Sequence, residues 1–328
     1  MKASISKIFN EFSSIRVLVI GDSMLDNYIW GHVSRISPEA PVPVIQVRRR
    51  DARLGGAANV ALNLKSLGAT PILVSLIGND DYGKKFQECL VKNKISSEGL
   101  VKSTDRPTTV KTRVIASHQH VVRVDEEAEY EASAKEEKAL MTKIEKSLKG
   151  CDVIIFEDYD KGTITKELIS KTTQLAKKYK IPIVVDPKKR NFLAYREVDL
   201  FKPNLKEVRE GLKKDINPSK INEIKQAVAE LKKLLNVSGV MLTLSEQGIF
   251  IDYNSKHVMV PAHTREIADV SGAGDTVVSI AALCVALDLS PDLIAGLSNL
   301  GGGLVCQHVG VVPIDKKEFL EEAKKEFH

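Results

Sequence analysis

Short apolar runs alternate with longer amphipathic segments along most of the chain. Five of these runs are apolar at almost every position, which is typical of strands buried on both faces. They are Arg16–Gly21, Ile72–Ile77, Val153–Phe156, Ile183–Val185 and Val240–Leu244. Helical patterns separate most of the runs and cover Ala57–Leu67, Tyr82–Lys92, Lys135–Lys149 and Thr165–Tyr179. Strands that alternate with helices predict an α/β fold, in which helices cover both faces of a mostly parallel sheet.

Two stretches do not follow this alternation. Tyr28–Arg50 has a strand-like pattern that contains prolines, and Thr109–Asp125 is typical of a hairpin with its polar turn at Ser117–His120. We interpret both as a small β-sheet that projects from the main domain as a lid over its cleft. The sequence therefore predicts one domain over residues 1–328, with a lid insert formed by about residues 28–50 and 107–125.

Composition is typical of a folded soluble protein, with 43% hydrophobic and 28% charged residues. The net charge of +5 is spread over many residues, which argues against a nucleic-acid partner. The four cysteines are Cys89, Cys151, Cys284 and Cys306, and their wide separation favours a reducing cytoplasm over a zinc site or disulfides. The N-terminus lacks the features of a signal peptide, and no apolar run approaches the roughly 20 residues that span a bilayer. We expect a cytoplasmic protein without a membrane partner.

The strongest candidate for chemistry is the segment Asp269–Asp275. Gly272, Ala273 and Gly274 precede an apolar helix at Thr276–Leu287, and the free N–H groups and dipole of a helix start favour an anion. Asp275 would lie beside that anion and could accept a proton from an attacking hydroxyl. An Asp at an ordinary helix start after a flexible turn explains the same residues equally well.

Two other nucleotide-binding patterns are missing from the chain. The G-x-x-x-x-G-K-[ST] pattern of a Walker A loop is absent. Gly21 does not open a G-x-G-x-x-G fingerprint, which argues against a dinucleotide-dependent dehydrogenase.

Polar residues near two other strand ends are candidates for sugar binding. Gly55 and Gly56 allow a ligand to approach the backbone closely, and Asn59 could bond to sugar hydroxyls, although a tight turn before a helix needs the same residues. Asp22 and Asp26 follow the first strand, where carboxylates can bind neutral hydroxyls. Helix capping by Asp22 is the alternative.

Two later segments are candidates for the nucleotide. Asn204 and Glu207, in the run Lys202–Glu207, could hold a hydrated Mg²⁺ ion, although the same pair is typical of a helix capping box. The turn Thr243–Gly248 links two predicted strands and could line a nucleotide pocket.

Several basic residues lie near predicted strand ends or on the predicted lid. They are Lys111, Arg113, Arg123, Lys161 and Lys188. Convergence of several of them would indicate a substrate that already carries a negative charge, whereas each one taken alone is typical of a surface charge.

Taken in order, these segments resemble the ribokinase-like (PfkB) carbohydrate kinases, from about Val17 to Pro313. The most specific parts are Gly55 and Gly56 with Asn59, and Asp269–Asp275. Ser271 stands where the family usually has Thr, and Ser245 where many members have Gly. The resemblance implies a three-layer α/β/α sandwich with a mostly parallel central sheet and a small β-sheet lid.

A narrower resemblance is to the D-glycero-D-manno-heptose 7-phosphate kinase branch of this family. The segments that carry it are Gly21–Asp26, Ser34–Pro43, Gly55–Ala61, Asp158–Gly162, Asp186–Lys188, Pro203–Glu207 and Ser245–Gly248. This branch makes heptose 1,7-bisphosphate for lipopolysaccharide precursors. The chain contains no H-x-G-H motif of the fused nucleotidyltransferase, so we expect a stand-alone kinase. A kinase for another sugar or a nucleoside, or a catalytically silent sugar-phosphate sensor, is the alternative.

The resemblance also implies a role for each candidate residue. Asp275 would be the base, and backbone groups of Gly272, Ala273 and Gly274 would form the anion hole. ATP and Mg²⁺ would be bound by Asn204, Leu205, Lys206, Glu207, Thr243, Ser245 and Gly248, with Asn204 and Glu207 nearest the metal. The sugar phosphate would be bound by Asp22, Asp26, Gly55, Gly56, Asn59, Arg113, Arg123, Lys161 and Lys188. The lid would pair two subunits as a homodimer.

Overall fold

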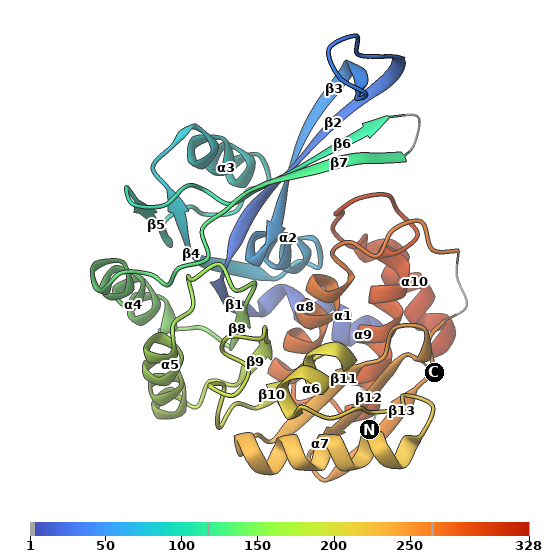
Figure 1. The fold of residues 1–328 in the computed structure, drawn as a ribbon. Coiled ribbons are helices and arrows are strands. Elements are labelled where there is room, and N and C mark those ends of the chain that lie inside the picture. Colours follow the sequence, from blue (N-terminus) through green and yellow to red (C-terminus); the bar gives the residue numbers. More distant parts are fainter. Residues whose placement is uncertain (1–3, 117–118, 264–265, 328) are drawn as a thin grey trace.

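The computed structural model describes residues 4–116, 119–263 and 266–327, and these form two β-sheets and ten α-helices (Figure 1). The main sheet has nine strands in the order β13-β12-β11-β10-β9-β8-β1-β4-β5. Its strands are β1 (Arg16–Gly21), β4 (Thr70–Gly78), β5 (Leu100–Ser103), β8 (Val153–Glu157), β9 (Ile183–Asp186), β10 (Leu200–Phe201), β11 (Gly239–Thr243), β12 (Ile249–Tyr253) and β13 (Lys256–Val260). All neighbours from β5 to β11 are parallel, and only β12 and β13 are antiparallel.

Helices cover both faces of this sheet and make three layers. One layer consists of α1 (Ile5–Glu11), α2 (Ala57–Ser66), α3 (Asp81–Lys92), α8 (Ala273–Ala286), α9 (Pro291–Val305) and α10 (Lys316–Glu326). The opposite layer consists of α4 (Ala134–Leu148), α5 (Lys166–Tyr179), α6 (Leu205–Leu212) and α7 (Ile221–Leu235). The predicted α/β architecture and all the predicted helices and strands named above are confirmed, with bounds that differ by a few residues.

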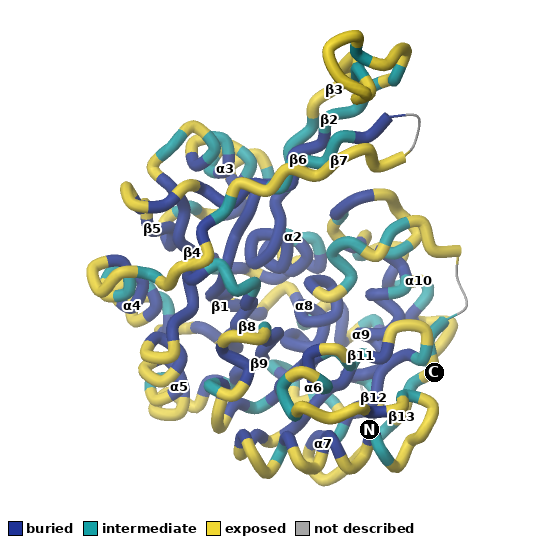
Figure 2. Tube along the Cα trace, in the orientation of Figure 1, coloured by how far each residue is buried: buried dark blue, intermediate teal, exposed yellow. Residues whose placement is uncertain are grey.

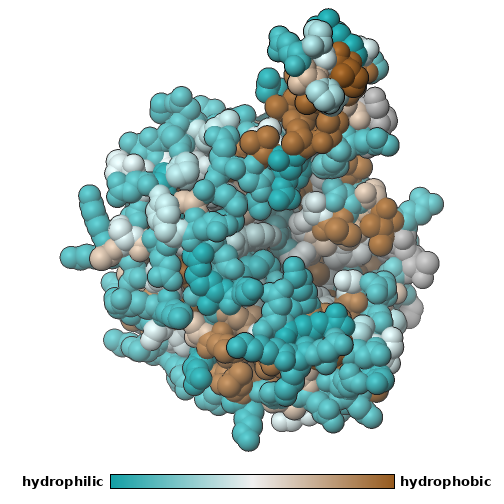
Figure 3. Space-filling model, in the orientation of Figure 1, coloured by the Kyte–Doolittle hydropathy of each residue, from teal (hydrophilic) through white to brown (hydrophobic). Residues whose placement is uncertain are grey.

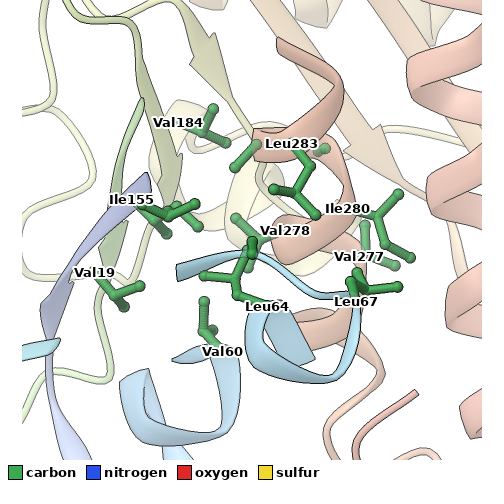
Figure 4. Packing of buried hydrophobic residues seen from close by; sticks show 14 of the residues in the cluster. Val19, Val60, Leu64, Leu67, Ile155, Val184, Val277, Val278, Ile280 and Leu283 are labelled. Carbon is green, nitrogen blue, oxygen red and sulfur yellow. The ribbon is translucent and has the colours of Figure 1, made fainter. Parts of the chain in front are cut away.

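Alternation along the strands assigns their side chains to the two cores. On β1, Val17 and Val19 pack with the α2 and α8 layer, whereas Leu18 and Ile20 pack with the α4 and α5 layer. Because both faces are covered, these strands are buried almost throughout and are apolar at nearly every position (Figure 2). Figure 4 shows the first core, where side chains of α2 lie against those of α8.

The second sheet projects from the main body (Figure 1). Its strands are β2 (Ser23–Ile36), β3 (Pro43–Gly56), β6 (Val110–Ala116) and β7 (Gln119–Glu126), in the order β3-β2-β6-β7. The predicted hairpin at Thr109–Asp125 is confirmed, and residues 117–118 of its turn lie outside the described residues. β2 and β3 run further than we expected, down to Ser23 and Gly56, so Asp26 and Gly55 lie on strands and not in loops. No helix within the described ranges is long and apolar enough to cross a membrane.

Candidate active site

The site is centred on Asp275, in the first turn of α8. Gly272 is the N-cap residue of this helix and has a φ of 82°, in the left-handed region that favours glycine. A glycine cap has no side chain to bond the first N–H groups, so backbone donors remain at the helix start. Ala273 N–H donates to the Val270 carbonyl over 3.3 Å, so this donor is partly engaged. The predicted anion-binding turn therefore has the expected local geometry, and anion binding itself stays a prediction.

Two side-chain donors from distant segments bond the Asp275 carboxylate, which is 3% exposed. Asn59 Nδ2 donates to Oδ2 over 2.7 Å, and the Tyr159 hydroxyl donates to Oδ1 over 2.7 Å. Burial raises the pKa of Asp275 to about 6, while these two hydrogen bonds act in the opposite direction and the charges of Asp186 and Asp26 add to the rise. A carboxylate of this pKa is mostly ionised at neutral pH, and it can accept a proton more readily than an exposed aspartate.

Asn59 belongs to the first turn of α2, so the starts of α2 and α8 face each other across the site. Thr276 Oγ1 also donates to Asn63 Oδ1 over 3.1 Å, which joins the two helices a turn further on. The structure thus brings together the two glycine-containing segments that the sequence analysis placed in one site. Gly56 has a φ of 57°, and a Cβ atom there would lie 2.3 Å from the Asp22 carbonyl oxygen. Both features require glycine at this position.

The structure gives the Asp22 carboxylate partners within the protein, and its predicted role of binding a sugar hydroxyl stays a prediction. Its Oδ2 accepts hydrogen bonds from the backbone N–H groups of Tyr159 (2.9 Å) and Lys161 (3.0 Å), and its Oδ1 accepts one from Thr163 (2.9 Å). The residue is 1% exposed. Three backbone donors occupy this buried carboxylate, so the structure makes Asp22 the anchor of the loop after β8.

Asp26 lies on the second sheet beside Gly55 and forms an ion pair with Arg113 of β6. A Cβ atom at Gly55 would lie 2.2 Å from Asp26 Oδ2, so only glycine leaves room for this carboxylate. The guanidinium group of Arg113 also lies over the Tyr28 ring, 5.4 Å from its centroid. Asp26 and Arg113 remain candidates for substrate contacts, but each already has a partner of opposite charge.

Three other candidate cations form ion pairs with carboxylates. Lys161 Nζ is 2.7 Å from Glu127 Oε1, and Lys188 Nζ is 2.7 Å from Glu207 Oε1. Arg123 pairs with Asp125 on the exposed strand β7. Each of these three side chains thus has a carboxylate partner in the structure, and a role for them in binding the substrate phosphate stays a prediction.

Sequence reasoning missed four polar residues that surround Asp275. Tyr159 is one, and the others are Glu157, Asp186 and Lys202. Glu157 and Asp186 end adjacent parallel strands in register, and Lys202 Nζ is 2.8 Å from Asp186 Oδ2. Burial, followed by the charges of Asp186 and Asp275, raises the pKa of Glu157 well above its usual range. The available signal was their position at or just beyond the carboxyl ends of apolar strands, where α/β folds place binding sites.

The candidate nucleotide residues lie side by side on the next strands of the sheet. Asn204 forms a parallel bridge with Thr243, and Thr243 N–H donates to the Pro203 carbonyl over 3.1 Å. The turn that follows contains two residues with positive φ, 52° at Ser245 and 92° at Gly248. At Gly248 a Cβ atom would lie 2.0 Å from a carbonyl oxygen, so this turn requires glycine.

Asn204 and Glu207 form the capping box that was the alternative to a metal site. Asn204 N–H donates to Glu207 Oε2 over 2.8 Å, and Glu207 N–H donates to Asn204 Oδ1 over 2.9 Å. Lys188 takes the second oxygen of Glu207. Within the described ranges no group of three or more Cys, His, Asp or Glu side chains is arranged to hold a metal ion. A Mg²⁺ ion that keeps its water shell and binds mainly to nucleotide phosphates fits such a site, and this role for the pair stays a prediction.

A buried carboxylate beside a glycine-capped helix start, at the carboxyl ends of parallel strands and beneath a second sheet, defines an α/β enzyme suited to group transfer to a hydroxyl. The chain belongs to the pfkB family of carbohydrate kinases, whose model matches residues 14–317. It is a sugar kinase, as the resemblance in the sequence predicted.

Curated relatives cover most of this chain. It is 37% identical to the "Bifunctional protein HldE" of Syntrophotalea carbinolica, over 98% of this chain and 65% of that protein. It is also 37% identical to the protein of the same name from Aliarcobacter butzleri, over 93% of this chain and 63% of that one. The chain therefore spans less than two thirds of the length of these relatives.

Solved structures confirm the ribokinase-like fold. Phosphofructokinase-2 from Escherichia coli, in complex with potassium, superposes with a TM-score of 0.79 at 17% identity, over 95% of this chain and 98% of that one. Ribokinase from Arabidopsis thaliana, complexed with ribose and ATP, gives a TM-score of 0.71 at 18% identity, over 94% and 98% of the two chains.

Proposed function

We propose that the protein transfers the γ-phosphoryl group of ATP to the anomeric hydroxyl of D-glycero-D-manno-heptose 7-phosphate. The product would be heptose 1,7-bisphosphate, a precursor of the lipopolysaccharide core. The observation that carries the kinase chemistry is the buried Asp275 carboxylate at the glycine-capped start of α8. The choice of sugar is supported by the segments that resemble heptose 7-phosphate kinases and by the extent of the match to the HldE proteins.

In this mechanism Asp275 accepts the proton of the anomeric hydroxyl while that oxygen attacks the γ-phosphorus in line. Backbone N–H groups at Gly272, Ala273 and Gly274 stabilise negative charge on the transferred group. Asn59 orients the carboxylate from the opposite helix. Bound Mg²⁺, held through Asn204 and Glu207, would neutralise charge on the nucleotide phosphates.

A coupled assay of ADP release over a panel of sugars tests this proposal. The panel should include heptose 7-phosphate, its unphosphorylated heptose, fructose 6-phosphate and ribose, with Asp275→Asn as the control for turnover. We expect the highest kcat/KM for heptose 7-phosphate. Preference for an unphosphorylated sugar would contradict the proposed substrate. Tight binding of a sugar phosphate without ADP release would indicate a sensor and not a kinase.

We also propose that the second sheet pairs two subunits. Apolar side chains are exposed on it, among them Val122 (49%) and Val124 (50%) of β7 and Ile36 (60%) at the end of β2. Figure 3 shows apolar surface on this projecting sheet. Exposed apolar side chains gathered in one place are typical of association surfaces. Sedimentation of the wild type should give a dimer, and Val122→Glu should shift it toward the monomer. A monomeric wild type at micromolar concentration would contradict the pairing.

A further inference from the structure

Tyr159 is the polar residue nearest the reaction that neither the sequence analysis nor the proposed mechanism uses. Its hydroxyl lies 2.7 Å from Asp275 Oδ1, and Asn59 occupies the other oxygen. Burial and the charge of Asp275 raise the pKa of the Tyr159 hydroxyl well above its usual range, so the phenol keeps its proton and acts as a donor.

The loop that carries Tyr159 is fixed in place by hydrogen bonds from several of its residues. Asp22 accepts from the backbone N–H groups of Tyr159, Lys161 and Thr163 over 2.9 to 3.0 Å. The Lys188 ammonium lies over the phenol ring, 5.3 Å from its centroid. The backbone that carries the phenol cannot move without breaking these bonds, and the Lys188 contact and the bond to Asp275 hold the ring itself.

We propose that Tyr159 is a positioning residue, which orients Asp275 and keeps it ready to accept the proton of the attacking sugar hydroxyl. This inference rests on the proposed function of Asp275 as the base. Tyr159 gives up no proton in the step. The sugar oxygen forms its bond to phosphorus, the bond from phosphorus to the leaving oxygen of ADP breaks, and the hydroxyl proton moves to Asp275.

Removing the phenol donor should change the acidity of Asp275 in a known direction. A hydrogen bond to the ionised form of a carboxyl lowers its pKa, so its loss raises the pKa. The other charged groups near Asp275 are Asp26 on β2, Glu157 on β8 and Asp186 on β9, with Lys202 paired to Asp186. These groups are all retained in a Tyr159→Phe variant, so a shift in that variant reports on the phenol hydroxyl.

The test is the pH profile of kcat/KM for the best sugar in the panel, measured for the wild type and Tyr159→Phe. The acid limb of the variant should move upward by about one pH unit. Turnover should fall roughly tenfold on the acid limb and recover to within about threefold of the wild type above pH 8. KM for the sugar should change little, because the phenol bonds the base in the proposed mechanism.

Tyr195 offers a matched control. Its hydroxyl donates to Asp158 Oδ2 over 2.6 Å, so it is a second phenol bonded to a carboxylate close to the same loop, and it is buried whereas Tyr159 is half-buried. Tyr195→Phe should leave the pH profile in place. A difluorotyrosine at position 159, whose hydroxyl is a stronger donor, should move the acid limb downward and provides a readout that does not depend on deleting the group.

The outcomes separate this inference from the proposal on which it rests. An unchanged profile in Tyr159→Phe, or an equal fractional loss at every pH, would leave Tyr159 with a structural role only and overturn the inference. Full turnover in Asp275→Asn would instead overturn the proposed base, whatever Tyr159→Phe does. An upward shift in both Tyr159→Phe and Tyr195→Phe would also contradict a specific role for Tyr159.

Discussion

Asp22 and Asp275 are both buried carboxylates at the carboxyl edge of the main sheet, with exposures of 1% and 3%. Backbone N–H groups of one loop occupy Asp22, whereas side chains from two other segments, Asn59 and Tyr159, bond Asp275. Backbone donors fix a carboxylate as part of the fold. Side-chain donors orient a carboxylate and still leave it lone pairs that a ligand can approach. Burial alone therefore does not identify the residue that takes part in the chemistry.

The two carboxylates are also connected. Asp22 holds the backbone of Tyr159, and the hydroxyl of the same residue bonds Asp275. A change at Asp22 should thus act on stability first and on the base only indirectly.

Asp275→Asn should have the largest effect on activity. If Asp275 is the base, its loss should lower kcat on the order of 10²–10⁴-fold, because an amide cannot accept the hydroxyl proton. Sugar and nucleotide binding, measured by calorimetry, should be retained. Near-normal turnover in Asp275→Asn would show that Asp275 is not the base.

Asp22→Ala should have the largest effect on stability. Three N–H groups, one of them buried and two half-buried, lose their acceptor. Each buried unsatisfied donor costs about 1–3 kcal/mol, so we expect a loss of a few kcal/mol in denaturant unfolding. Asp152→Ala is the matched control. Asp152 is exposed and accepts one backbone N–H, from Arg16, over 2.7 Å. Arg16 begins β1, the strand that Asp22 follows. Equal losses in the two variants would show that the Asp22 anchor is no more than an ordinary surface contact.

The smallest expected effect is the pH dependence that Asp275 gives to the free energy of unfolding. The folded pKa of Asp275 is raised from 3.8 to about 6, so its contribution to stability is present below pH 4 and is lost as the pH rises through 6. At pH 7 the ionised carboxylate therefore costs stability, and Asp275→Asn should gain about 1–3 kcal/mol relative to the wild type. Thermal unfolding of both proteins between pH 4 and 8 measures this. A difference in stability that does not change with pH would contradict the raised pKa.

The hydrophobic pattern determined much of the fold. Apolar runs such as Arg16–Gly21 and Val153–Phe156 are typical of strands buried on both faces, and the periodic segments between them are typical of helices that cover a sheet. The sequence also indicated two helix starts. One is the glycine cap before Asp275, and the other is the capping box of Asn204 and Glu207. These features depend on residues a few positions apart, so the sequence alone states them.

Only the tertiary structure decided what the charged residues do. The partners of Asp22, Lys161 and Lys188 lie on other segments, and nothing in the local pattern indicates that their charges are already satisfied. Tyr159 was likewise invisible as a neighbour of Asp275, because 116 positions separate the two in sequence. The sequence by itself determined the layers, the helix starts and the family resemblance. The fold decided which buried carboxylate accepts backbone donors and which accepts side-chain donors, because a side chain's ionisation and bonding depend on the donors and charges that distant segments bring to it.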